Sequence, residues 1–87
     1  MIAANTIIMD FDGHSAWPPE SRWTDAGAVK PITIEEDVWI GMNCVILKGV
    51  TIGKGAIVGP NSVVIHDIEP GCLYAGNPAK KIKDYTQ

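Results

Sequence analysis

Branched apolar residues recur at every sixth position from the middle of the chain onwards. The run begins at Ile34, ends at Glu69 and divides into six consecutive hexapeptides without a gap. The first position is Ile or Val in every hexapeptide: Ile34, Ile40, Ile46, Ile52, Val58 and Val64. The fifth position is always small or aliphatic: Val38, Cys44, Val50, Ala56, Ser62 and Ile68. A period of six fits neither a 3.6-residue helix nor a simple hairpin, and it predicts a parallel β-helix.

The period also predicts which residues stack. Three hexapeptides make an 18-residue triangular coil, so Ile34 and Ile52 return to the same face, with coils roughly 4.7–4.9 Å apart. The branched first-position side chain points inward, where a β-branched shape packs well. Gly41, Gly53 and Gly59 fill the second position, which we place at corners that need either a positive φ or close backbone approach. The alternative, a chance run in a Val/Ile-rich sandwich, is disfavoured because all six hexapeptides match at two positions.

The repeat is interrupted once and then decays. Residues 1–12 read as a partial first coil whose two hexapeptides begin at Ile2 and Ile8. Ile34 lies 26 residues after Ile8, which is not a multiple of six, so the phase is broken there. The prolines, glycines and tryptophans of the break predict an extruded loop over 13–33, a place where function often resides. Residues 34–69 then form two full coils, and 70–87 a capping tail. We expect a single all-β domain over 1–87.

Composition narrows the possible functions. The chain has 87 residues and a net charge of −3, with no basic run, so nucleic acid is not an expected partner. It has no 18-residue apolar stretch and its first residues lack the basic region of a signal peptide, so neither a membrane partner nor export is expected. Cys44 and Cys72 do not match a zinc spacing, and Cys44 falls on an inward position. A reduced, cytoplasmic protein is the resulting expectation.

The ends of so short a β-helix are a structural problem. About two and a half coils leave unpaired strand edges above and below, and a solenoid normally needs about three repeats with capping units. We therefore expect the ends to be covered by other copies of the chain or by further sequence. A cyclic homotrimer is the assembly that we predict.

Three motifs resemble those of a known family. They are Val38-Trp39-Ile40-Gly41, Gly49-Val50-Thr51-Ile52-Gly53 and Ala75-Gly76-Asn77-Pro78-Ala79-Lys80. In this order they look like the C-terminal half of the hexapeptide-repeat acetyltransferases, nearest to the maltose and galactoside O-acetyltransferases. Family members usually carry many more residues before the equivalent of Ile2.

The resemblance implies a fold and an activity. The fold would be a left-handed parallel β-helix, and only the resemblance gives that hand, because β-crossovers are ordinarily right-handed. The activity would be acetyl transfer from acetyl-CoA to a sugar hydroxyl. The family forms trimers whose active sites lie between neighbouring prisms.

Two histidines are candidates for the base that such a reaction needs. Imidazole has the appropriate unperturbed pKa, and positioned proton transfer contributes roughly 10²–10⁴-fold. His14 lies in the predicted loop and matches the family's catalytic histidine. His66 occupies the third position of a hexapeptide, which favours an exposed surface histidine.

The residues around His14 suggest an acceptor site. Asp10, Asp12 and His14 alternate, so an extended chain would place them on one face. These three residues could bind a metal ion, but three ligands from one strand rarely satisfy the coordination geometry of a metal. We therefore expect no metal site here. We assign Asp10 and Asp12 to the substrate, one of them orienting the imidazole or a hydroxyl. Trp17 is a stacking wall for a sugar or a neighbouring subunit, or, like Trp23, an anchor of the loop.

The resemblance also implies where acetyl-CoA binds. Its pantetheine arm would follow small or backbone-exposed positions between two prisms, and lysines of the tail would meet its phosphates. Four of the seven cationic residues, Lys54, Lys80, Lys81 and Lys83, lie in the last 34 residues, and this concentration of positive charge supports the assignment. A solvated cationic tail is the alternative. The cofactor-binding set is Gly41, Met42, Gly59, Pro60, Ile65, Lys80 and Lys83.

Other functions are compatible with part of the pattern. A γ-class carbonic anhydrase shares the prism but needs three zinc-binding histidines, and this chain has two. A covalent route through Cys44 is set aside, because that thiol faces the interior without a histidine to activate it. A trimerisation module without catalytic activity stays as the second hypothesis.

Overall fold

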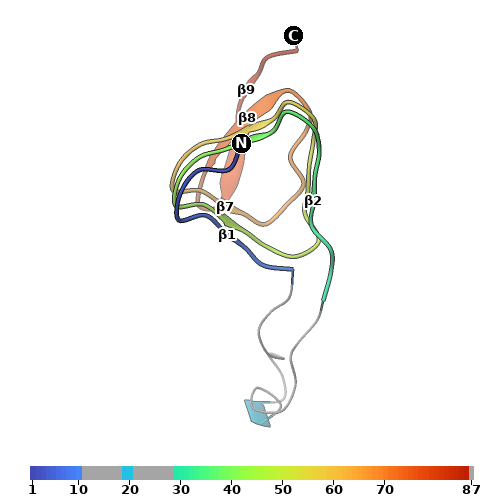
Figure 1. Cartoon of the computed structure of the whole chain (residues 1–87), viewed down its shortest axis with the longest axis vertical. Coiled ribbons are helices and arrows are strands. Elements are labelled where there is room, and N and C mark those ends of the chain that lie inside the picture. The colour runs from blue at the N-terminus through green and yellow to red at the C-terminus, as the bar shows by residue number, and fades with distance from the viewer. Residues whose placement is uncertain (11–18, 21–28, 87) are drawn as a thin grey trace.

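The fold is a stack of short parallel strands arranged around three sides. The computed structural model describes residues 1–10, 19–20 and 29–86. In Figure 1 the successive coils lie over one another as a three-sided outline. The strands are β1 (Ile7–Ile8), β2 (Thr33–Ile34), β3 (Trp39–Ile40), β4 (Val45–Ile46), β5 (Thr51–Ile52), β6 (Ile57–Val58), β7 (Val63–Val64), β8 (Cys72–Gly76) and β9 (Ala79–Asp84).

The strands form three walls with the predicted register. The three-stranded wall has the order β1-β4-β7, the two-stranded wall is β2-β5, and the four-stranded wall is β3-β6-β8-β9. Ile34 pairs with Ile52 and Ile40 pairs with Val58, both in parallel. Among the described strands, only β8 and β9, beyond the repeat, pair antiparallel. The predicted parallel β-helix with an 18-residue coil is confirmed.

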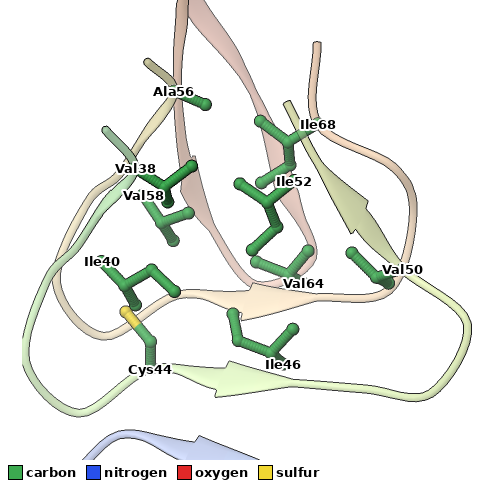
Figure 2. Packing of buried hydrophobic residues seen from close by; sticks show 10 residues of the cluster. All are labelled: Val38, Ile40, Cys44, Ile46, Val50, Ile52, Ala56, Val58, Val64 and Ile68. Atoms are coloured by element: carbon green, nitrogen blue, oxygen red, sulfur yellow. The ribbon is translucent and has the colours of Figure 1, made fainter. Parts of the chain in front are cut away.

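The interior holds the residues that the repeat predicted. Ile40, Ile46 and Ile52 are completely buried, and all fifth-position residues of the six hexapeptides are buried as well. Figure 2 shows the hydrophobic residues among them converging between the three walls. Ile34 is only half-buried and Ile8 is exposed, because among the described residues no strand pairs with the outer edges of β1 and β2.

The corners are made by the fourth position of the first five hexapeptides. Asp37, Asn43 and Asn61 have φ angles of 60°, 57° and 61°, and Gly49 and Gly55 have 75° and 72°. This left-handed region is tolerated best by glycine and, among other residues, by Asn and Asp. The fourth position therefore turns the chain.

The second-position glycines are needed because the backbones of two successive coils approach each other closely there. None of them has a positive φ, so that alternative is wrong for this position. A Cβ at Gly41 would lie 2.8 Å from the backbone nitrogen of Pro60, closer than real Cβ contacts allow. Here glycine lets one coil pass close beneath the next.

The phase break is an insertion within one corner of the first coil. Ile2 bridges to Ile40 and Ile8 pairs with Ile46, so both occupy regular coil positions. Ile34 then occupies the next wall. The Lys30 N–H donates to the Asp10 carbonyl at 2.8 Å and closes the base of the insertion.

The repeat ends in a shortened coil and a hairpin. Ile68 pairs with Ile52, so the last coil is two residues shorter than the regular 18-residue coil. The Asp67 carboxylate accepts the Thr51 N–H at 2.8 Å. β8 then continues the wall above β6, with Tyr74 above Val58 and packed against the core. β9 turns back antiparallel, so the predicted capping tail is the outer strand of a wall. In the part of the chain that the structure describes, no helix has the length and apolar character that a bilayer crossing requires.

Candidate functional site

Four of the predicted cofactor residues gather at one corner. We call the segments 41–44 and 59–62 the glycine corner; there the chain passes from the four-stranded to the three-stranded wall. The Gly41 N–H donates to Val58 and the Gly59 N–H donates to Tyr74, each at 2.8 Å, so consecutive coils are in register. Met42 and Pro60 are exposed at this corner. The predicted column of Gly41, Met42, Gly59 and Pro60 therefore exists in the structure.

Side chains inside the prism fix the peptide planes of this corner. The Thr6 hydroxyl donates to the Gly41 carbonyl at 2.8 Å, and the Ser62 hydroxyl donates to the Gly59 carbonyl at 2.7 Å. The Cys44 thiol adds a contact to the Gly59 carbonyl at 3.2 Å. Because a trans peptide directs its carbonyl and its N–H to opposite sides, the Met42 N–H points away from Thr6. The sequence analysis assigned no role in the site to Thr6 or Ser62, although a hydroxyl at a fifth position that is otherwise apolar was a visible signal.

The lysines of the tail lie on a hairpin next to this corner. Lys80 pairs with Ala75 across β8 and β9, and the Cβ of Ala75 lies 3.0 Å from an ideal Cβ built on Gly59. The backbone of Lys80 therefore lies beside the glycine corner. Lys83 lies further along β9, where its Nζ is 4.9 Å from the centroid of the Tyr85 ring.

Lys81 belongs to a structural contact of the same hairpin. Its Nζ lies 2.8 Å from a Glu69 carboxylate oxygen, and this hydrogen bond raises the pKa of Lys81. The Glu69, Cys72 and Asp84 ligand atoms lie within 4.8 Å of one another, a spacing that a metal ion could bridge. Within this cluster Glu69 is paired with the ammonium of Lys81, and the Asp84 carboxylate accepts the Thr86 N–H at 2.9 Å.

Neither cysteine is placed as a nucleophile. Cys44 and Cys72 are both free and buried. Burial raises the pKa of the Cys72 thiol, and the nearby Asp84 carboxylate raises it further. Reactive thiols need exposure and a lowered pKa. The interior position that we predicted for Cys44 is confirmed.

Ile65 lies at a different corner. It follows β7 at the end of the three-stranded wall, where the insertion leaves the first coil, and we call segments 9–10, 29–32, 47–50 and 65–67 the loop corner. Within one prism Ile65 is therefore not placed with the glycine corner. Its side chain is 43% exposed, so it is open to a ligand or a neighbour. Asp10 and His66 are also exposed at the loop corner.

The remaining predicted residues fall on the insertion. His14, Asp12, Trp17 and Trp23 lie outside the described residues. Asp10 and Lys30 mark the two ends from which that segment departs, joined by the backbone bond between them. The assignments of His14, Asp12 and Trp17 stay predictions.

The outer surfaces of the walls differ in polarity. Trp39, Ile57 and Leu73 follow one another in register on the four-stranded wall. Ile7, Val45 and Val63 do the same on the three-stranded wall. The two-stranded wall carries Thr33 and Thr51 instead. Two of the three walls therefore present apolar ladders to the outside.

Comparison with known proteins places the repeat in a family. Residues 31–66 match the family model described as "Bacterial transferase hexapeptide (six repeats)". A putative acetyltransferase of Schizosaccharomyces pombe is 51% identical over 53 residues, which are 61% of this chain and 26% of that protein. A 2,3,4,5-tetrahydropyridine-2,6-dicarboxylate N-acetyltransferase of Staphylococcus aureus is 48% identical over 60 residues, 69% of this chain and 25% of that protein. The matched part thus spans about a quarter of these curated relatives.

Solved structures extend the similarity over nearly the whole chain. A hexapeptide-repeat acetyltransferase of Vibrio cholerae complexed with acetyl-CoA has a TM-score of 0.86 and 40% identity, covering 94% of this chain and 44% of that one. A galactoside acetyltransferase in complex with CoA has a TM-score of 0.79 and 35% identity, covering 97% and 44%. A maltose O-acetyltransferase of Clostridium difficile has a TM-score of 0.79 and 30% identity, covering 95% and 46%.

Proposed function

Because this chain belongs to the hexapeptide-repeat acetyltransferase family and has its left-handed β-helix fold, we propose that it transfers an acetyl group from acetyl-CoA to a hydroxyl of a sugar or saccharide-like acceptor. The glycine corner carries the proposal. It combines closely stacked backbone at Gly41 and Gly59 with exposed positions at Met42 and Pro60. A relative that is similar over 94% of this chain was solved with acetyl-CoA.

The geometry suits the two chemically distinct parts of acetyl-CoA. The Met42 N–H, which points away from Thr6, can donate to an amide carbonyl of the pantetheine arm or to the thioester oxygen. Lys80 starts on the neighbouring strand, where its ammonium can reach a phosphate. The backbone corner would thus bind the arm, and the lysine the nucleotide end.

The chemistry we propose is direct transfer. His14 removes the proton of the acceptor hydroxyl, and the oxygen attacks the thioester carbonyl carbon. A backbone N–H stabilises the oxyanion of the tetrahedral intermediate, which collapses with departure of the CoA thiolate. The products are the acetyl ester and CoA, with the thiolate taking up a proton.

Relatives suggest two kinds of acceptor. The galactoside and maltose acetyltransferases support a sugar hydroxyl, which is our first choice. The Staphylococcus aureus relative is an N-acetyltransferase, so an amine is the second candidate. Assays of CoA release with mono- and disaccharides and with matched amino sugars would separate these two acceptors.

We expect the chain to form a cyclic homotrimer. A closed ring of three needs two different contact faces on each protomer, and the two apolar ladders provide two such faces while the third wall stays polar. Such a ring can also bring the loop corner of one prism to the glycine corner of the next. Light scattering should give three times the monomer mass at micromolar concentration. A stable monomer there would contradict the assembly and the shared site.

Replacing Lys80 by alanine should weaken acetyl-CoA binding about five- to tenfold with little change in turnover. The lost group is one charge-assisted contact to a phosphate, which the acetyl-transfer step does not use. Titration calorimetry with acetyl-CoA measures the Kd, and a CoA-release assay measures kcat.

Lys54→Ala is the matched control for this charge. Lys54 is also exposed, but it lies at the corner between β5 and β6, where its carbonyl accepts the Gly71 N–H at 2.9 Å. It is thus near the start of β8, at the opposite end of that strand from the turn that precedes Lys80. Equal weakening in both variants would indicate a general charge effect and no phosphate contact at Lys80. If the wild-type trimer binds no acetyl-CoA, the proposed function fails and the trimerisation module becomes the better hypothesis.

A further inference from the structure

Ser62 departs from the apolar pattern of the fifth position. At the other two corners of the prism this position holds Val, Ala or Ile. Among the described residues, Ser62 is the one polar side chain that is buried, with 0% exposure. A hydroxyl so placed costs free energy unless it is hydrogen-bonded. Its partners therefore show what it does.

The hydroxyl joins two parts of the molecule. It donates to the Gly59 carbonyl at 2.7 Å and accepts the Gly76 N–H at 3.1 Å. Gly59 belongs to the glycine corner, whereas Gly76 ends β8 and opens the turn to β9.

The bond to Gly76 uses a side-chain acceptor, whereas the lower coils use backbone acceptors at this corner. In those coils the N–H groups of Asn43 and Asn61 donate to the carbonyls of Ala4 at 3.1 Å and Met42 at 3.0 Å. Gly76 lies one position earlier, above Pro60 in the register of β6 and β8. Above Ser62 the chain leaves the coil and turns back, with a φ of 107° at Gly76. The side-chain hydroxyl supplies the acceptor at that point.

We propose that Ser62 is a positioning residue that fixes the β8–β9 hairpin over the glycine corner and thereby sets the affinity for acetyl-CoA. The inference rests on the proposed function. Ala79 packs against the core directly after the turn, and Lys80 follows it. The position of the turn therefore determines where the Lys80 ammonium lies relative to Met42. Without the Ser62 hydroxyl, the two halves of the proposed site are held together less firmly.

The test compares Ser62→Ala with Ser62→Thr. The alanine variant loses both hydrogen bonds, and we expect about five- to tenfold weaker acetyl-CoA binding by calorimetry, with kcat changed less than twofold. The threonine variant keeps the hydroxyl and should bind like the wild type, since Thr6 already occupies the corresponding place in the first coil. Hydrogen exchange of residues 74–84 should accelerate in Ser62→Ala relative to that of residues 39–46.

Val38→Ala controls for a loss of core packing. Val38 is a fifth-position residue with 4% exposure at the corner between β2 and β3, which belongs to neither the glycine corner nor the loop corner. In its wall β6 separates β3 from β8, so the truncation lowers stability without touching the hairpin. We expect it to keep wild-type acetyl-CoA affinity. Unchanged binding and exchange in Ser62→Ala, or equal weakening in Val38→Ala, would overturn the inference.

The exchange measurement separates this inference from the proposed function. If the wild type binds no acetyl-CoA, the proposed function fails, and the link from Ser62 to cofactor affinity fails with it. Faster exchange of the hairpin in Ser62→Ala would then still support the anchoring role alone. If the wild type binds and only Ser62→Ala leaves the hairpin and the affinity unchanged, the proposed function stands and the positioning role is wrong.

Discussion

Replacing His14 by alanine should lower the turnover number about 10²-fold or more and leave acetyl-CoA affinity nearly unchanged. In the proposed reaction the imidazole accepts the proton of the acceptor hydroxyl and does not hold the cofactor, so the two effects should separate. Steady-state assays of CoA release give kcat, and calorimetry gives the Kd for acetyl-CoA. Lys80→Ala is expected to do the reverse, weakening acetyl-CoA binding with little change in kcat.

His66→Ala is the matched control for this experiment. It removes the other histidine of the chain, which is exposed at the loop corner. Its turnover should stay within about twofold of the wild type, because the proposed reaction takes the acceptor proton through His14 and gives the exposed His66 no role. An active His14→Ala variant would refute the assignment of the base. Loss of activity in His66→Ala with retention in His14→Ala would move the base to the other histidine.

The register of the coils could be predicted because one physical constraint repeats. A residue such as Ile52 must lie inside a prism of fixed perimeter, so its partner 18 residues earlier, Ile34, follows from counting. The same constraint holds at Ile40 and Val58, whose pairing was also predicted. Any slip by one residue would turn the buried faces outward. Because so many of the repeat's apolar side chains are buried, few alternative registers of the coils are possible.

The corners were harder to predict because two kinds of residue share them. The sequence analysis considered a positive φ for the second-position glycines, but the turn is made at the fourth position. The signal was present, since Asp37, Asn43, Gly49, Gly55 and Asn61 are all residues that tolerate this conformation. Glycine is needed at Gly41 for a different reason, the nearness of Pro60.

The candidate site was predictable only in part. Gly41 and Gly59 are one coil apart in the sequence, so their stacking follows from the period. Ile65 could not be assigned in the same way, because it lies at another corner of the same prism. The roles of Thr6 and Ser62 depend on carbonyl directions, which a residue pattern does not reveal. The shortened last coil likewise depends on the Asp67 side chain taking the place of a carbonyl.

Truncation of the interior should have the largest effect on stability. Ile52→Ala is expected to lower the free energy of unfolding by about 2–5 kcal/mol, through lost burial and the cavity that remains. Ile52 has 0% exposure and is paired with Ile34 below and Ile68 above. Figure 2 shows its side chain in the interior near Ile68 and Val64. Urea unfolding at one fixed protomer concentration measures the change, because an assembled protein's stability depends on concentration.

Thr51→Ala tests whether this loss comes from the stacked interior. Thr51 is the other residue of β5 and faces outward on the polar wall, so its truncation should change the free energy of unfolding by no more than about 0.5 kcal/mol. Ile52→Val keeps the branched shape and should fall between the two, at about 0.5–1.5 kcal/mol. The graded order follows from a column in which each coil buries the next. If Ile52→Ala costs no more than Thr51→Ala, the coil interior does not carry the stability of the fold.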